Sequence, residues 1–153
     1  MILKMLRKTP GPRGFPTEVA HTPDRATLRV PLGSGDELVG WLSLDYKRED
    51  PLVVSIAVRA PSRAAVLERT MLRTDLRNSL NICIRYKSMT VEPGTRGFTS
   101  FQFEERLVIV TTLVPSDVIS RFLRATDEVV PPGQAETTVV SSMLEDLLQD
   151  SGA

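Results

Sequence analysis

The chain has 153 residues, of which 41% are hydrophobic and 25% charged, and its 19 basic side chains balance 19 acidic ones. This size and composition predict one globular domain with its own core, and they argue against a disordered chain. The balanced charge also argues against a dedicated duplex-DNA binder, because such proteins neutralise phosphates with an excess of Lys and Arg.

The cysteine content and the hydropathy pattern limit the compartment. Cys83 is the one cysteine, so no disulfide can form within the chain. The first residues carry charge within a short apolar run and lack the apolar core of a signal peptide. No stretch approaches the ~20 apolar residues that span a membrane. These features predict a cytoplasmic protein.

Residues 1–23 differ in composition from the rest of the chain. They are rich in basic side chains and in proline, with Pro10, Pro12, Pro16 and Pro23. Because proline fixes φ and lacks an amide donor, we expect a flexible basic arm here instead of a sheet strand. The arm is either a solvated tail or a weak anchor for an acidic partner. We expect the folded domain over residues 24–150 and a short tail over 151–153.

Alternating apolar and polar residues dominate the middle of the chain and predict strands. The predicted strands are 26–32, 38–46, 52–59, 82–87, 99–104 and 106–114. Residues 90–97 contain Pro93 and Gly94 and are predicted to form a loop. Residues 62–80 are ambiguous, because their composition favours a helix.

The last third changes to a helical period. Val118, Ile119, Phe122 and Leu123 form one apolar stripe after Ser116, a candidate N-cap, and the helix should stop before Pro131. A second stripe contains Val140, Met143, Leu144, Leu147 and Leu148. Each stripe belongs either to the core or to a subunit contact. Strands followed by two C-terminal helices predict an α+β protein.

Residues that could carry catalysis are scarce. His21 is the one histidine, and it falls in the predicted arm, where no base could be held against a nucleophile. Cys83 is read as a packed thiol. Glu104 and Glu105 are adjacent in a strand, so they point to opposite faces and suit a hairpin turn. One His and one Cys do not make a structural zinc site. We therefore expect no enzyme, no cofactor and no metal.

Binding is the remaining class of function. Phe98, Phe101, Phe103, Arg85 and Lys87 are candidates for stacking and charge contacts with single-stranded nucleic acid, although most aromatic residues are expected in the core. Trp41 is either a core residue or an interface anchor. The candidate partner-binding residues are Trp41, Arg59, Arg85 and Lys87.

Three short motifs occur in a fixed order along the chain. In the first, Tyr46 is followed by Asp50-Pro51 and Val53-Val54, and in the second, Val66-Leu67-Glu68 is followed by Arg73-Thr74-Asp75-Leu76. In the third, residues 122–133 read Phe-Leu-x-x-Thr-Asp-x-x-Val-Pro-Pro-Gly. This ordered set resembles the SsgA-like family, nearest in style to its SsgB branch, and the third motif is like the closing helix and turn of that family. The resemblance spans roughly residues 26–150.

The resemblance implies a whirly-like fold, in which antiparallel β-sheets pack with helices. It implies that residues 65–72 are a strand and residues 73–79 a short helix. It also implies a homotrimer, with Phe122, Leu123, Met143, Leu144 and Leu147 in core or subunit-contact helices. Its function would be non-enzymatic regulation of septation and sporulation, through contacts with division-ring or septation proteins and recruitment to division septa. A whirly-like single-stranded nucleic-acid binder is the alternative.

Overall fold

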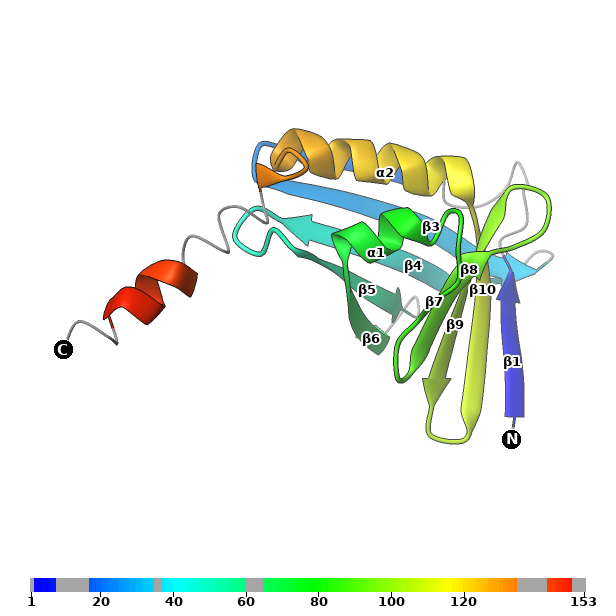
Figure 1. Cartoon of the computed structure of the whole chain (residues 1–153). Coiled ribbons are helices and arrows are strands. Elements are labelled where there is room, and N and C mark those ends of the chain that lie inside the picture. The colour runs from blue at the N-terminus through cyan, green and yellow to red at the C-terminus, as the bar shows by residue number, and fades with distance from the viewer. Residues whose placement is uncertain (1, 8–16, 35–36, 60–64, 135–142, 150–153) are drawn as a thin grey trace.

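The computed structural model describes residues 2–7, 17–34, 37–59, 65–134 and 143–149. Strands in this part of the chain form two five-stranded sheets, and Figure 1 shows helix α2 lying along one of them. The described structure is mostly strand with helices, as the α+β prediction and the family resemblance required.

The first sheet is an antiparallel meander in which every strand pairs with its neighbours in sequence. Its strands are β2 (Glu18–Thr22), β3 (Arg25–Ser34), β4 (Glu37–Lys47), β5 (Val53–Arg59) and β6 (Ala65–Leu72). A polar turn connects β4 to β5, as the sequence predicted at Asp50-Pro51. The strand over residues 65–72, which the family resemblance implied against helix propensity, is confirmed.

The second sheet has the order β1-β10-β9-β8-β7, and β1 is its parallel member. Its strands are β1 (Ile2–Arg7), β7 (Ile84–Arg85), β8 (Met89–Pro93), β9 (Phe98–Glu105) and β10 (Val108–Pro115). Helix α1 (Arg73–Asn78) connects the two sheets, and helix α2 (Ser116–Val129) follows β10 directly.

The core lies between the sheets and beneath α2. Alternate residues of β3 and β4 point into it, and Leu28, Leu42, Leu44 and Tyr46 are all fully buried. The apolar stripe of α2 closes this core, because Ile119, Phe122 and Leu123 are buried as well. Phe101 and Phe103 contribute from β9. The opposite face of the first sheet is therefore left without a covering helix in the described part of the chain (Figure 1).

The prediction of an unstructured arm over residues 1–23 is wrong for Ile2–Arg7 and Glu18–Thr22, which form β1 and β2. Proline does disfavour sheet interiors, but the strand Ile2–Arg7 contains none, and Pro23 occupies the turn between β2 and β3. The prolines at positions 10, 12 and 16 lie outside the described residues.

Three further boundaries differ from the predictions. Residues 89–93 form β8 although a loop was predicted, because Pro93 ends the strand at a position that sheets tolerate. The strand predicted over 82–87 is reduced to Ile84–Arg85. The N-cap of α2 is Pro115, and Ser116 is the first helical residue, with its hydroxyl 2.8 Å from that of Thr99.

Candidate functional site

The family-like motifs meet at one buried arginine. Arg73, the first residue of α1, is only 3% exposed. Its guanidinium donates hydrogen bonds to the carbonyl oxygens of Thr126 at 3.1 Å and of Val130 at 2.7 Å. These carbonyls lie at the C-terminal end of α2, which carries partial negative charge, and the Thr126 carbonyl also accepts the Val130 amide at 2.9 Å. The Arg73 side chain therefore caps the C-terminal end of α2.

Two neighbouring contacts complete this arrangement. The carboxylate of Asp127 accepts a hydrogen bond from Arg77 at 2.6 Å and lies 3.5 Å from the guanidinium of Arg73. The Tyr46 hydroxyl donates to the carbonyl oxygen of Pro51 at 2.9 Å. The residues in these contacts come from β4, the following turn, α1 and α2, so the motif set is explained by structure. These contacts hold β4, α1 and α2 together.

The uncovered face of the first sheet carries the sequence-predicted tryptophan. Trp41 lies directly opposite Arg59 in the β4–β5 ladder, so both side chains project from the same face. Arg29, from β3, lies over the Trp41 ring with its guanidinium carbon 4.8 Å from the ring centroid, a cation–π arrangement. Trp41 is thus partly exposed between two arginines. Sequence reasoning missed Arg29, although its place on the polar face of β3 was readable from alternation.

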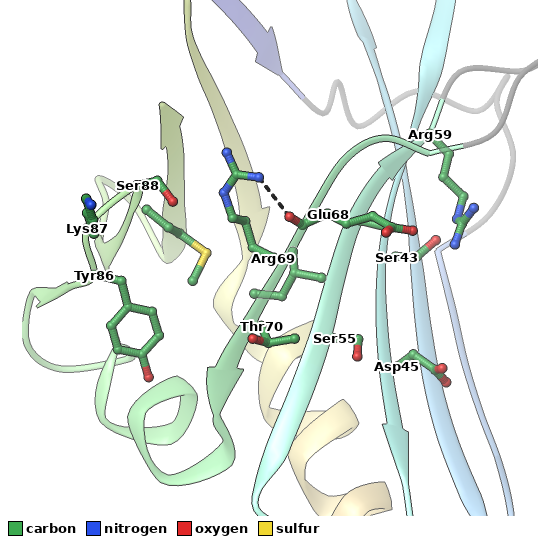
Figure 2. Close-up of a pocket in the computed structure, with 13 residues that line it drawn as sticks. Ser43, Asp45, Ser55, Arg59, Glu68, Arg69, Thr70, Tyr86, Lys87 and Ser88 are labelled. Atoms are coloured by element: carbon green, nitrogen blue, oxygen red, sulfur yellow. Dashed lines mark hydrogen bonds between the residues drawn. The ribbon is translucent and has the colours of Figure 1, made fainter. Parts of the chain in front are cut away.

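A shallow groove begins on this face and extends past the edge of β6. We call it the β6 groove; its volume is about 630 Å³. Its lining residues are Ser43, Asp45, Ser55, Ile56, Ala57, Arg59, Glu68, Arg69, Thr70, Tyr86, Lys87, Ser88 and Met89. Figure 2 shows Arg59, Glu68 and Asp45 on one side of β6, and Tyr86, Lys87 and Ser88 on the other. Arg59 and Lys87 thus share one groove, whereas Trp41 and Arg85 do not line it.

Two of the charged residues lining the groove are already paired. Asp45 accepts hydrogen bonds from Arg25 at 2.6 Å and 3.0 Å, and this pairing raises the pKa of Arg25. Arg69 pairs with Glu105 at 2.7 Å, and this hydrogen bond lowers the pKa of Glu105. Arg69 shares one face of β6 with the buried Leu67 and Met71, so a charge on an otherwise apolar face was a sequence signal for this residue.

Tyr86 connects the β7–β8 hairpin to the first sheet. Its hydroxyl accepts a hydrogen bond from the Leu72 amide at 3.0 Å and donates one to the Asp75 carboxylate. Partial burial, followed by this hydrogen bond to Asp75, raises the pKa of Tyr86. Tyr86 is therefore a positioning residue at one end of the groove.

The structure also places the residues considered for catalysis. His21 is not in a loose arm: it lies in β2, and its Nε2 is 2.6 Å from the Glu128 carboxylate at the surface. Cys83 is exposed, so the prediction of a packed thiol is wrong; the strand that was expected to bury it starts one residue later. Glu104 and Glu105 end β9 beside a turn, as predicted. The described residues contain no cluster of three or more His, Cys, Asp or Glu that would hold a metal.

The other predicted residues divide between the core and the surface. Phe101 and Phe103 are buried and pack on each other with their ring centroids 6.3 Å apart, so neither is available to stack on bases. Phe122 and Leu123 lie in the core. Met143, Leu144 and Leu147 are 59%, 54% and 63% exposed on the helical segment 143–149, so they do not belong to the core of this chain. None of the described helices combines the length and the apolar character that a membrane span requires.

Comparison with solved structures defines the class of fold. A structure described as "Crystal structure of SsgA-like sporulation-specific cell division protein from Thermobifida fusca" has a TM-score of 0.62 and 18% identity, over 83% of this chain and 99% of that chain. Another, described as "Mutations in SsgB correlate to longitudinal cell division during sporulation of Streptomyces coelicolor", has a TM-score of 0.60 and 18% identity, over 79% and 95%. The protein therefore has the fold of the SsgA-like proteins.

The sequence itself matches the model of the family described as "Streptomyces sporulation and cell division protein, SsgA" over residues 41–135. The chain belongs to the SsgA family. No curated protein matches the chain with significant sequence similarity. The family resemblance drawn from the motifs is confirmed.

Proposed function

We propose that this chain is a non-enzymatic regulator of septation and sporulation that works through contacts with division-ring or septation proteins. Membership of the SsgA family supports the role in sporulation and cell division. The observation that carries the mode of action is Trp41, held between Arg29 and Arg59 on a sheet face that no described helix covers. Tryptophan and arginine are the side chains most enriched among residues that dominate binding energy at protein interfaces.

The arginines on this face favour an acidic partner surface. Neither Arg29 nor Arg59 has an ion-pair partner among the described residues, whereas Arg25, further along β3, is matched by Asp45. An exposed cation pair beside an indole combines charge attraction with a large contact area at low entropic cost. Lys87, from the β7–β8 hairpin, adds a positive charge that shares the β6 groove with Arg59.

The test is direct binding to the tubulin-like division-ring protein and to other septation proteins of the same organism. Trp41→Ala and Arg59→Glu should each weaken binding by about tenfold or more, which corresponds to ~1.4 kcal/mol. Arg124→Glu is the matched control, because Arg124 is exposed on α2, which covers the other face. Equal loss in all three variants, or no binding by the wild type, would reject the proposal.

A homotrimer at division septa is part of the same proposal. The exposed apolar side chains of Met143, Leu144 and Leu147 support a subunit contact, since such a stripe is stabilised by burial against a second surface. Light scattering should give a trimer that the double variant Leu144→Gln/Leu147→Gln dissociates. Leu107→Gln, at a residue 74% exposed in a turn, is the control and should leave the trimer intact. A wild-type monomer would refute this part.

A further inference from the structure

Strand β6 has a free edge in the described structure. It is the terminal strand of the order β2-β3-β4-β5-β6, so β5 occupies one side and no described strand pairs with the other. Unpaired edges present a row of amide and carbonyl groups on which another extended chain can pair. Natural proteins usually block such edges, so an open one is informative.

The direction of the free backbone groups follows from two hydrogen bonds. The Arg73 amide donates to the Leu52 carbonyl oxygen at 2.8 Å, so Arg73 continues the ladder with β5. The Leu72 amide donates instead to the Tyr86 hydroxyl at 3.0 Å, on the opposite side. Because backbone groups alternate along an antiparallel strand, those of Thr70 and Glu68 point away from β5, as Leu72 does.

Tyr86 satisfies only the last of these outward amides. Its hydroxyl takes the place that a carbonyl of an added strand would occupy beside Leu72. The Glu68 carbonyl oxygen accepts a hydrogen bond from the Arg69 side chain at 2.7 Å (Figure 2). Outside the sheet ladder, neither the Glu68 amide nor the Thr70 amide donates a backbone hydrogen bond to another described residue. The unpaired stretch is thus centred on Thr70 and ends at Tyr86.

This stretch lies in the β6 groove. Glu68 and Thr70 form one wall, and Tyr86, Lys87 and Ser88 form the other. The groove also contains a buried donor without a partner, the Nε atom of Arg69. Buried donors in folded proteins are nearly always hydrogen-bonded, so an acceptor supplied from outside would complete this one.

The unpaired charges that line the β6 groove indicate which charge a bound segment should carry. Asp45 is neutralised by Arg25, and Arg69 by Glu105. Among the lining residues this leaves Arg59 and Lys87 against Glu68, a balance in favour of positive charge. Arg29 adds a further positive charge on the same sheet face, on the other side of β4 from Arg59. An extended segment that carries carboxylates fits this pattern better than a basic one.

We propose that the β6 groove binds an extended acidic segment of a partner protein, which adds to the outer edge of β6 as a further strand. The segment would exchange hydrogen bonds with the amide and carbonyl of Thr70 and accept one from the Glu68 amide. Its carboxylates would lie near Arg59 and Lys87. The proposal rests on the proposed function, because it names how the division or septation partner engages this surface.

The first experiment uses the full chain and a synthetic probe peptide about eight residues long, in which valine alternates with aspartate, as a strand with two different faces requires. Binding is measured by fluorescence anisotropy and by amide hydrogen exchange. The acidic probe should bind and slow the exchange of the Thr70 and Glu68 amides. A probe with lysine in place of aspartate should bind about tenfold more weakly. Equal binding of both probes would refute the charge selection.

Backbone methylation of the probe tests strand pairing without altering the protein. An N-methyl group removes a donor and blocks one edge of the peptide. Methylating one set of alternate residues should abolish binding, while methylating the other set should leave it within about twofold, because only one edge of an added strand faces β6. If both sets bind alike, the peptide does not add to the edge and the proposal is wrong.

Thr70→Pro tests the same edge from the side of the protein. Proline removes the outward amide but spares the ladder with β5, and sheets tolerate it on edge strands. Binding of the acidic probe should fall by about tenfold or more. Thr70→Val keeps the amide and should bind as the wild type does. Circular dichroism establishes whether Thr70→Pro is folded. If this variant does not fold, the N-methylated probes alone test whether the peptide pairs with β6.

The outcomes separate this proposal from the proposed function. If the whole partner protein binds Thr70→Pro as it binds the wild type, yet loses affinity for Trp41→Ala, the sheet face is used and the edge is not. If acidic probes bind but no division or septation protein does, the groove stands and its partner belongs elsewhere. Preference for a single-stranded oligonucleotide over the acidic probe would overturn the proposal.

Discussion

The guanidinium carbon of Arg73 lies 5.0 Å from the centroid of the Tyr46 ring, in the buried region where α1, α2 and β4 meet. Tyr46 begins one family-like motif, Arg73 begins the helical part of a second, and the carbonyls that Arg73 contacts belong to the motif over residues 122–133. A buried cation on an aromatic face gains from the ring quadrupole and needs full hydrogen bonding to repay its desolvation. The motif residues are therefore spaced along the chain to build one joint.

Arg73→Met should destabilise the protein by about 3 kcal/mol, because it removes a charge-assisted hydrogen bond to the Thr126 carbonyl and takes the guanidinium donor away from the Val130 carbonyl. Urea unfolding followed by the fluorescence of Trp41, the one tryptophan, measures the change. Arg73→Lys should recover only part of the loss, because an ammonium cannot reproduce the planar fork of the guanidinium.

Arg77→Met is the matched control for this prediction. Arg77 pairs with the same carboxylate, Asp127, but its side chain is 41% exposed. Exposed ion pairs contribute at most about 1 kcal/mol, so this variant should remain close to the wild type. Equal destabilisation of Arg73→Met and Arg77→Met would contradict the assignment of the joint to Arg73.

The Tyr86 hydroxyl predicts a loss of stability at alkaline pH. Its folded-state pKa is raised above the ordinary 10.0, first by burial and then by the hydrogen bond to Asp75. A raised folded-state pKa gives a contribution that is complete below the unfolded-state value and is lost as pH rises through the folded-state value. The free energy of unfolding should therefore decrease above about pH 10.

Ultraviolet difference titration and unfolding curves of Tyr86→Phe provide the comparison. The variant should lose the part of the alkaline decrease that belongs to Tyr86, and its titration should report Tyr46 alone. If the wild type and Tyr86→Phe lose stability in parallel as the pH rises, Tyr86 does not join the hairpin to β6 as its contacts indicate.

The sequence predicted β3, β4 and β5 of the first sheet and the amphipathic helix α2 well, because each presents an apolar face to the core, whereas β2 was missed. Leu42, Leu44 and Tyr46 alternate with Ser43 and Asp45, and the buried set follows that alternation. Residues 65–72 required the family resemblance. Their helix formers, such as Leu67 and Met71, satisfy a helical spacing as well as a strand, and only pairing with β5 decides between them.

The candidate site was less predictable, because it depends on which strands become neighbours. Arg59 was named as a surface residue, but its position opposite Trp41 comes from the β4–β5 register. The side chain of Thr70 gives no indication of a binding role. In the proposed strand addition Thr70 contributes through its backbone amide, which points away from β5. The salt bridge of Arg69 to Glu105 joins the two sheets across 36 residues of sequence. Local patterns do not encode such contacts.

Strand β1 belongs to the second sheet, although the sequence predicted a flexible arm over these residues. Ile2–Arg7 pairs in parallel with Val108–Leu113 of β10 and so covers an edge rich in β-branched residues. Removing residues 1–7 should uncover this edge, speed amide exchange in β10 and promote self-association, since long apolar edges pair with other chains. Light scattering and hydrogen exchange measure both effects.

The matched control keeps β1 and replaces residues 8–16 with a Gly-Ser linker of equal length, which changes the composition of the connection but not the strand pairing. It should exchange and scatter as the wild type does. If the truncated chain also behaves as the wild type, β1 contributes nothing to the second sheet, and the original expectation of an independent arm is restored for residues 1–7. If only the truncated chain self-associates, the parallel strand protects β10 and the N-terminal segment belongs to the domain.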